Sequence, residues 1–461
     1  MRKKYLLFCL LACLTAVPLL SQKEKPPEGG APKDFVLPER QAFTLDNGLA
    51  ATLVQFGDLP KVTVRVVLRA GNLDEAADEV WLADLTGNLL KEGTTTRSAE
   101  QIADQAGGMG GVIDVAVDAD QTTISADVLS EFGSRLVPLI ADIARNPLLP
   151  QSEIERLKAD LQRNLSIEKS QPQSIALESF RKALYPDHPY GRVFPTEEMI
   201  RTYTVEKVRG FYQRNFGAAR AHVYVAGRFD GSAVEKALRE AFGDWTRGPE
   251  PLLNPPAPRT EHIIHLIDRP GAPQSTLYLG LPVVDPSSPD FMSLQVTNAL
   301  LGGVFSSRIT TNIREDKGYT YSPHSSISAR YRDAYWLESA DVTTEVTGAS
   351  LKEIFYEIGR LQKEAPPAEE LSGIQNYMAG TFVLRNSQRG DIISQLAFLD
   401  LHGLGIDYLT NYVRNIMAVT PEQVQKMTQT YLQDQKMTLV VVGDKAKVEA
   451  QLKPYGPLAA N

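Results

Sequence analysis

The chain has 461 residues, of which 43% are hydrophobic and 23% are charged, as in an ordinary soluble globular protein. Its length exceeds that of one ordinary hydrophobic core and predicts two or three domains. The formal net charge is −8, and no basic stretch in the body of the chain is available to neutralise phosphates. We therefore expect no nucleic-acid partner.

The N-terminal segment has the pattern of an export signal. A positive RKK stretch precedes an uncharged, mostly apolar run at 5–20, and Ser21 is a small residue at a plausible cleavage edge. One alternative is an uncleaved membrane anchor. Another is a lipoprotein with Cys13 as the lipidated residue, which would attach the protein to a membrane. We expect an exported, periplasmic protein that is either soluble or membrane-associated.

Both cysteines of the chain, Cys9 and Cys13, lie inside this segment. Cleavage after the segment would leave a mature chain with no thiol, and therefore with no disulfide, no cysteine zinc ligand and no cysteine nucleophile. Cleavage also removes three positive charges, which changes the formal net charge from −8 to −11.

Two stretches rich in proline, QKEKPPEGGAPK and PEPLLNPPAP, separate the remaining parts of the chain. Neither stretch suits a helix or a central strand, so we interpret them as connecting segments. The expected organisation is a signal peptide at 1–21, a flexible tether at 22–34, an N-terminal domain at 35–248, a linker at 249–259 and a C-terminal domain at 260–461.

Taken in chain order, the elements of the two domains repeat. The N-terminal domain is expected to contain a strand at 61–69, helices at 79–91 and 99–106, a hairpin across 112–129, and helices at 130–145 and 151–170. The C-terminal domain is expected to contain a strand at 275–281, a helix at 289–301, a hairpin formed by 325–331 and 334–342, and helices at 350–364 and 368–389. This order predicts an α+β fold of two homologous domains, each a mainly antiparallel sheet covered on one face by helices.

Three motifs carry a resemblance to a known family. The segment 43–51 (FTLDNGLAA), the segment 69–94 (RAGNLDEAADEVWLADLTGNLLKEGT) and the HPYG sequence at 188–191 resemble segments of the zinc peptidases that include insulinase, pitrilysin and the mitochondrial processing peptidases. The resemblance spans nearly all of the mature chain. It implies that the two domains form one half of a clam-shaped metallopeptidase.

Active members of this family carry His-x-x-Glu-His on the helix that corresponds to 79–91. Two histidines one turn apart bind one zinc ion, and the glutamate acts as general base on zinc-bound water. In register with Glu92-Gly93-Thr94, this chain has Asp84 and Asn88 at the histidine positions and Gly87 at the glutamate position. The resemblance therefore implies a degenerate zinc motif.

A third family ligand, usually a glutamate, follows on a later helix about 75 residues further on. That position falls near Arg163 or Asn164, and neither is a carboxylate, while Glu168 lies in a different register. We expect no family-type zinc site and no cofactor in this chain. The pair His262 and His265 is no substitute, because residues three apart on a strand point to opposite faces.

The C-terminal domain retains a family segment at 308–323 (RITTNIREDKGYTYSP). It resembles the family pattern in which an arginine and a tyrosine seven residues apart act on the substrate, here Arg314 and Tyr321. The resemblance implies that Arg314 grips a substrate carbonyl and that Tyr321 donates a hydrogen bond to the developing oxyanion. The alternative is that Arg314 makes a surface ion pair and Tyr321 is a hairpin core residue.

The lost zinc motif and the retained arginine and tyrosine together predict a non-catalytic subunit of a two-chain zinc peptidase. A homologous partner subunit would hold the zinc, and the substrates would be unstructured peptides. A second hypothesis is a stand-alone peptide-binding or scaffold protein of the cell envelope. A third is an active enzyme with an unrecognised metal site that uses Asp84, Glu168 or Asp114.

Overall fold

The computed structural model describes residues 30, 33 and 35–459, and residues 34–461 form one compact unit. The expected signal peptide at 1–21 and the lipidation site at Cys13 lie outside the described residues, as does almost all of the expected tether. In the part of the chain that the structure describes, no helix is both long and apolar enough to cross a membrane.

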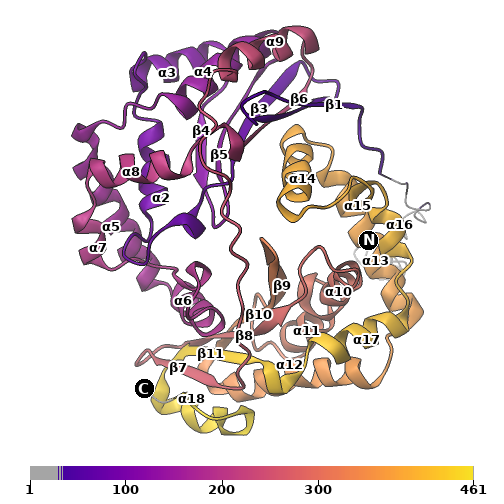
Figure 1. Cartoon of the computed structure of the whole chain (residues 1–461). Coiled ribbons are helices and arrows are strands. Elements are labelled where there is room, and N and C mark those ends of the chain that lie inside the picture. The colour runs from indigo at the N-terminus through magenta and orange to yellow at the C-terminus, as the bar shows by residue number, and fades with distance from the viewer. Residues whose placement is uncertain (1–29, 31–32, 34, 460–461) are drawn as a thin grey trace, which may run out of the picture. The chain divides into compact units, whose positions relative to one another are not determined.

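The N-terminal half is built on a six-stranded sheet with the strand order β1-β2-β6-β3-β5-β4 (Figure 1). Only β2 and β6 run parallel, and the other neighbours are antiparallel. The strands are β1 (Arg40–Thr44), β2 (Ala50–Gln55), β3 (Lys61–Leu68), β4 (Asp114–Val117), β5 (Thr122–Leu129) and β6 (Ala221–Gly227).

The C-terminal half repeats this plan in a five-stranded sheet with the order β7-β11-β8-β10-β9. Here β7 and β11 are the parallel pair, and the remaining pairs are antiparallel. The strands are β7 (Ile264–Asp268), β8 (Gln274–Val283), β9 (His324–Arg330), β10 (Asp333–Thr343) and β11 (Thr438–Gly443). The matching strand orders confirm the expected α+β fold of two homologous halves.

Helices supply the rest of both halves. Those of the N-terminal half are α2 (Leu82–Leu90), α3 (Ala99–Gly108), α4 (Gly133–Arg145), α5 (Ile154–Ser170), α6 (Pro172–Leu184), α7 (Glu197–Thr202), α8 (Val205–Asn215) and α9 (Gly231–Phe242). Those of the C-terminal half are α10 (Phe291–Asn298), α11 (Arg308–Thr310), α12 (Thr347–Lys363), α13 (Ala368–Arg385), α14 (Arg389–His402), α15 (Asp407–Thr410), α16 (Tyr412–Met417), α17 (Pro421–Tyr431) and α18 (Lys445–Leu452). Two π-helical segments, η6 (Ala299–Gly303) and η7 (Thr311–Asp316), follow α10 and α11.

Side-chain contacts move some boundaries away from those expected. The helix expected to begin at Glu79 begins at Leu82, because Trp81 takes a left-handed conformation (φ 69°) and its indole nitrogen donates to the Val193 carbonyl at 3.0 Å. The helix expected across 368–389 ends four residues early, at Arg385, and the next helix, α14, begins at Arg389. Asn386 separates them, with its side-chain amide donating back to the Phe382 carbonyl at 2.9 Å.

Each sheet was expected to be covered by helices on one face only, but the central strands are buried on both faces. On β3, Val62, Val64, Val66 and Leu68 belong to the core of the N-terminal half, while Val67 belongs to a second cluster. On β11, Leu439 and Val441 face one cluster, while Val440 and Val442 face another. Successive side chains of a strand point to opposite faces, so each sheet is packed on both sides.

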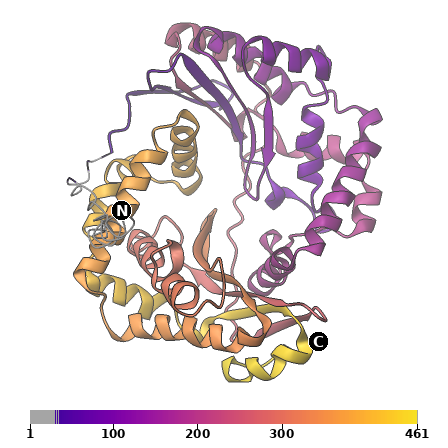
Figure 2. The ribbon, with the colours of Figure 1, turned by 180° about the vertical axis from the view of Figure 1, so that it is seen from behind.

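The second face of each sheet is covered by a helix from the opposite half. Helix α6 packs on β8 and β11, and helix α14 packs on β3 and β6, as both views show (Figures 1 and 2). The Tyr185 hydroxyl at the end of α6 donates to Asp333 at 2.6 Å, and Arg389 at the start of α14 donates to Asp127 at 3.0 Å. The two halves are therefore joined by a reciprocal exchange of helices as well as by the connecting segment.

Candidate functional site

The degenerate zinc motif lies on α2, a nine-residue helix packed into the N-terminal core. Seven of its residues are buried, and the two that are only half-buried are Asp84 and Asn88. Residues four apart share one face of a helix, so Asp84 and Asn88 have the spacing that the two histidines of the expected motif need. The helical spacing that the expected motif needs is therefore present on α2, with other residues at its positions.

Gly87 sits where α2 contacts the edge strand β4. A β-carbon built on Gly87 would lie 2.7 Å from Val117 Cγ2 and 3.5 Å from Val115 Cγ1. The first distance is shorter than a normal carbon–carbon contact, so the Val117 side chain of β4 occupies space that a glutamate at this position would need. A side chain at the position expected for the general base would therefore collide with Val117 of β4.

The amide of Asn72 joins two carboxyl groups, that of the buried Glu75 and that of the half-buried Asp84 on α2. Its nitrogen donates to Asp84 at 2.8 Å and to Glu75 at 3.1 Å. Glu75 also accepts the backbone N–H of Ala83 at 2.9 Å, which satisfies one of the free donors at the start of α2. Burial, followed by the nearby Asp84, raises the pKa of Glu75 to about 8, and burial also raises the pKa of Asp84.

As a set, these residues do not suit a zinc ion. Asp84 is bound to an amide, Asn88 is a poor zinc ligand, and the buried face of α5 carries leucines. Arg163 and Asn164 are exposed, and Glu168 accepts a hydrogen bond from Ser174 at 2.6 Å. Across residues 35–459, no three His, Cys, Asp or Glu side chains gather closely enough to hold a metal ion.

The raised pKa of Glu75 predicts a pH-dependent stability. The pKa is about 8 in the folded chain and 4.5 without the fold, so the stabilisation from the protonated group is complete below pH 4.5 and is lost as the pH rises through 8. Wild type should therefore lose about 1.4 kcal/mol of unfolding free energy per pH unit between pH 5 and 8 relative to Glu75→Gln. Urea unfolding at several pH values measures the difference.

Glu131→Gln, at an exposed glutamate of the same half, is the matched control and should follow wild type across this range. Parallel pH curves for wild type and Glu75→Gln would show that Glu75 is ionised in the folded protein.

Arg314 and Tyr321 come together in the C-terminal half, on the segment that follows α11. The Arg314 guanidinium carbon lies 4.7 Å from the centre of the Tyr321 ring and 4.5 Å from that of Phe305. Tyr321 is 80% exposed and Phe305 is 64% exposed, whereas the Arg314 side chain is 24% exposed. Two exposed aromatic rings thus hold the guanidinium by cation–π contacts.

Backbone contacts fix the chain between these two residues. Gly318 adopts φ 64°, a conformation that favours glycine, and its N–H donates to the Arg314 carbonyl at 3.1 Å. Tyr319 donates to the Ile313 carbonyl at 2.8 Å, and Thr320 bridges to Val342 of β10. The turn is therefore tied to the sheet, and it presents Tyr321 at its end.

This cluster offers donors to an oxygen ligand. Arg314 Nε contacts Glu315 Oε1 at 3.1 Å, and the terminal nitrogens of Arg314 and the hydroxyl of Tyr321 have no hydrogen-bond partner among the described residues. The ion pair with Glu315 agrees with part of the alternative interpretation, but Tyr321 is not a hairpin core residue. A guanidinium and a phenol side by side can stabilise negative charge on a carbonyl oxygen.

Other residues were placed only by the structure. Glu75 and Phe305 were not predicted from the sequence. The raised pKa of Glu75 depends on its burial, and the only sequence signal at Phe305 was an aromatic residue nine positions before Arg314. His262 contacts the Asp434 carbonyl at 3.0 Å, and His265 lies in β7, where burial lowers its pKa.

Two family models match the chain, one in each of the regions just described. Residues 57–195, which include α2, match the model of insulinase (peptidase family M16). Residues 202–378, which include Arg314 and Tyr321, match the model described as the peptidase M16 inactive domain.

Relatives and solved structures agree with these models. An uncharacterized zinc protease of Bacillus subtilis is 24% identical over 402 residues, which are 86% of this chain and 97% of that protein. One from Mycobacterium tuberculosis is 26% identical over 357 residues, 76% of this chain and 78% of that protein.

A crystal structure described as the peptidase M16 inactive domain from Pseudomonas fluorescens has a TM-score of 0.81 at 24% identity, and the match covers 88% of this chain and 98% of that one. A protease from Helicobacter pylori gives 0.82 at 18% identity, covering 88% and 100%. Because both halves match in sequence and in fold, the chain belongs to the insulinase family of zinc peptidases, family M16.

Proposed function

We propose that this chain is the non-catalytic subunit of a two-chain zinc peptidase and that it supplies Arg314 and Tyr321 to peptide substrates at a zinc site on a homologous partner. The observation that carries the proposal is the contrast between the two halves. The expected zinc-motif positions on α2 contact β4 and the Asn72 amide, while Arg314 and Tyr321 lie side by side and Tyr321 is exposed.

The donors suit one chemical task. During hydrolysis the oxygen of the scissile peptide carbonyl gains negative charge, and donors aimed at that oxygen lower the barrier. The Tyr321 hydroxyl and the terminal nitrogens of Arg314 are such donors, and the two rings around the guanidinium limit its motion. A partner chain must provide the attacking water and its base, since Gly87 stands at the position of the base in this chain.

Edge strands support peptide as the class of substrate. β4 and β9 each pair with only one neighbour, which leaves one backbone edge of each strand for an added peptide strand. β4 lies against α2, beside the degenerate motif. The same proposal places the complex in the periplasm, to which residues 1–21 would direct the chain.

Copurification followed by reconstitution tests the proposal. The tagged chain is recovered from native envelope extract, and the proteins that coelute are identified by mass spectrometry. We expect a homologue of similar size that carries His-x-x-Glu-His, in a ratio near one to one. Each chain alone should leave an unstructured peptide intact, and the mixture should cleave it.

Recovery of this chain alone would contradict the two-chain proposal, as would cleavage by the partner at an equal rate without it. Either result would favour a stand-alone peptide-binding or scaffold role in the envelope.

A further inference from the structure

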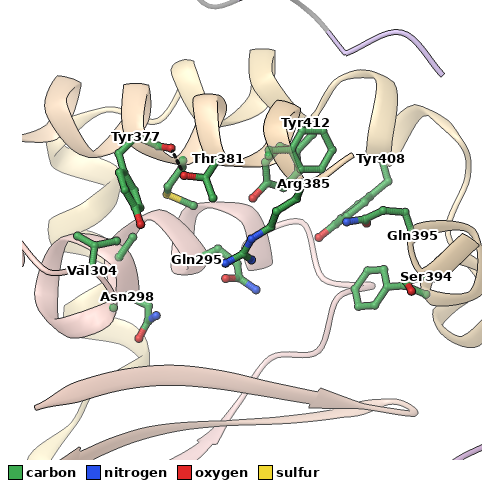
Figure 3. A pocket seen from close by; sticks show the side chains of 15 residues that line it. Gln295, Asn298, Val304, Tyr377, Thr381, Arg385, Ser394, Gln395, Tyr408 and Tyr412 are labelled. Carbon is green, nitrogen blue, oxygen red and sulfur yellow. Dashed lines mark hydrogen bonds between the residues drawn. The ribbon is translucent and has the colours of Figure 1, made fainter. Parts of the chain in front are cut away.

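A cavity of about 490 Å³ lies in the C-terminal half. Its fifteen lining residues come from α10 and η6 on one side and from α13, α14 and the start of α15 and α16 on the other (Figure 3). The volume falls in the range of about 300–1,000 Å³ that is typical of small-ligand sites.

The cavity carries a positive charge without a counter-ion. Arg385, in the last turn of α13, points into the cavity toward Gln295 (Figure 3). Within the described part of the chain, its guanidinium has no ion pair and no hydrogen bond, and the lining includes no acidic residue. An arginine without a carboxylate partner in a concave site is a binding group for an anion.

Further donors surround this arginine. The side chains of Gln295, Gln395, Tyr408 and Tyr412 line the cavity and have no hydrogen-bond partner among the described residues. Burial raises the pKa of Tyr412 to about 12 and also raises that of Tyr408, so both phenols are protonated donors at neutral pH. These side chains are bound to no other group of the described protein, so they are available to bind a ligand.

Asn298 also lines the cavity, but its side chain is hydrogen-bonded within the protein. Its side-chain oxygen accepts from Ser325 at 2.8 Å and from the Trp336 indole at 2.9 Å, so it is fully engaged in the protein. The unpaired groups of Arg385 and Gln295 are therefore not a general property of this region.

The remaining walls are apolar and aromatic. The Phe382 and Tyr412 rings stack at 3.8 Å between centres, Phe398 lies 5.9 Å from Tyr408, and Met378 completes the wall. A bare inorganic anion would leave this surface uncovered. The walls instead fit a ligand whose anionic group is joined to an apolar side chain.

We propose that this cavity binds an α-carboxylate attached to a residue with an apolar side chain, as found at the C-terminus of a peptide or in a free amino acid. Arg385 holds the carboxylate through two parallel N–H···O bonds, and the phenols and amides complete its hydrogen bonds. The apolar side chain packs among Phe382, Phe398 and Met378. The site needs no partner chain, so its test is independent of the proposal of a two-chain peptidase.

Calorimetric titration of the purified chain tests the site. The probes are an acetylated pentapeptide of four alanines and a C-terminal phenylalanine, the same peptide with an amidated C-terminus, and N-acetylphenylalanine. We expect the acid to bind at least about 10-fold more tightly than the amide, because the amide loses the charged contact. Comparable affinity for N-acetylphenylalanine would identify a free amino acid as sufficient, and markedly weaker affinity would identify a peptide end.

Substitutions test which side chains bind the carboxylate. Arg385→Gln should weaken binding of the acid about 10- to 100-fold and should have little effect on the amide. Arg385→Lys should fall between wild type and Arg385→Gln. Tyr412→Phe keeps the stacked ring and should weaken binding only a few-fold. Arg209→Gln, at an exposed arginine on α8, is the matched control and should bind as wild type does.

Equal affinities for acid and amide, or equal losses in Arg385→Gln and Arg209→Gln, would overturn the proposal. Two further results would overturn it. One is that neither acid binds at millimolar concentration, and the other is that inorganic phosphate displaces the acid peptide at equal concentration.

Discussion

Replacing Tyr321 by phenylalanine should lower the turnover of the assembled two-chain peptidase by about 100-fold, the cost of one lost oxyanion donor. The ring and its contact with Arg314 at 4.7 Å remain, so only the hydroxyl is removed. Because the hydroxyl acts on charge that develops in the transition state, kcat should fall while KM changes little. Steady-state hydrolysis of an unstructured peptide by the reconstituted complex measures both constants.

Tyr356→Phe is the control for this prediction, because Tyr356 is also an exposed tyrosine, on α12, outside the cluster. It should leave turnover unchanged. If the Tyr321→Phe complex assembled normally and worked at the wild-type rate, Tyr321 would have no role in the transition state, and the exposed ring would serve only to hold Arg314.

Replacing Phe180 by alanine should lower the free energy of unfolding by about 3–5 kcal/mol, the usual loss for a large aromatic side chain in a core. Phe180 belongs to α6 of the N-terminal half, yet it is fully buried against the C-terminal sheet. Its ring packs edge-on against Tyr335 at 5.4 Å between centres and contacts Gly280 of β8, which has no side chain to fill the gap. Urea unfolding followed by circular dichroism measures the loss.

Hydrogen exchange locates the effect. Amides of β8 and β11 should lose protection in Phe180→Ala although the substitution lies in the other half, because α6 covers these strands. Phe305→Ala, at an exposed position, should change stability by no more than about 1 kcal/mol. Loss of protection confined to the N-terminal half would show that α6 contributes little to the C-terminal sheet.

The sequence by itself was enough to identify the family, and it predicts where the family's zinc motif is altered. Short motifs with fixed spacing carry this information, because a metal site needs particular donor atoms one helical turn apart. Reading Asp84, Gly87 and Asn88 in place of His-x-x-Glu-His required only the register set by Glu92-Gly93-Thr94. The strands and helices across 61–170 and 275–389 were accessible for the same reason, since hydrophobic periodicity is a local property, whereas β6 and β11 were not predicted.

Only the tertiary structure showed what has replaced the motif and which helix covers which sheet. Three features depend on contacts between separate segments of the chain. They are the contact of β4 with Gly87, the link from Asp84 to Glu75 through Asn72, and the position of Arg385 in a cavity lined by no acidic residue. The exchange of α6 and α14 was equally hidden, because an amphipathic helix reveals that it has an apolar face but not which sheet will bury it. Burial and pKa follow from those contacts, so they were decided by packing rather than by any local pattern.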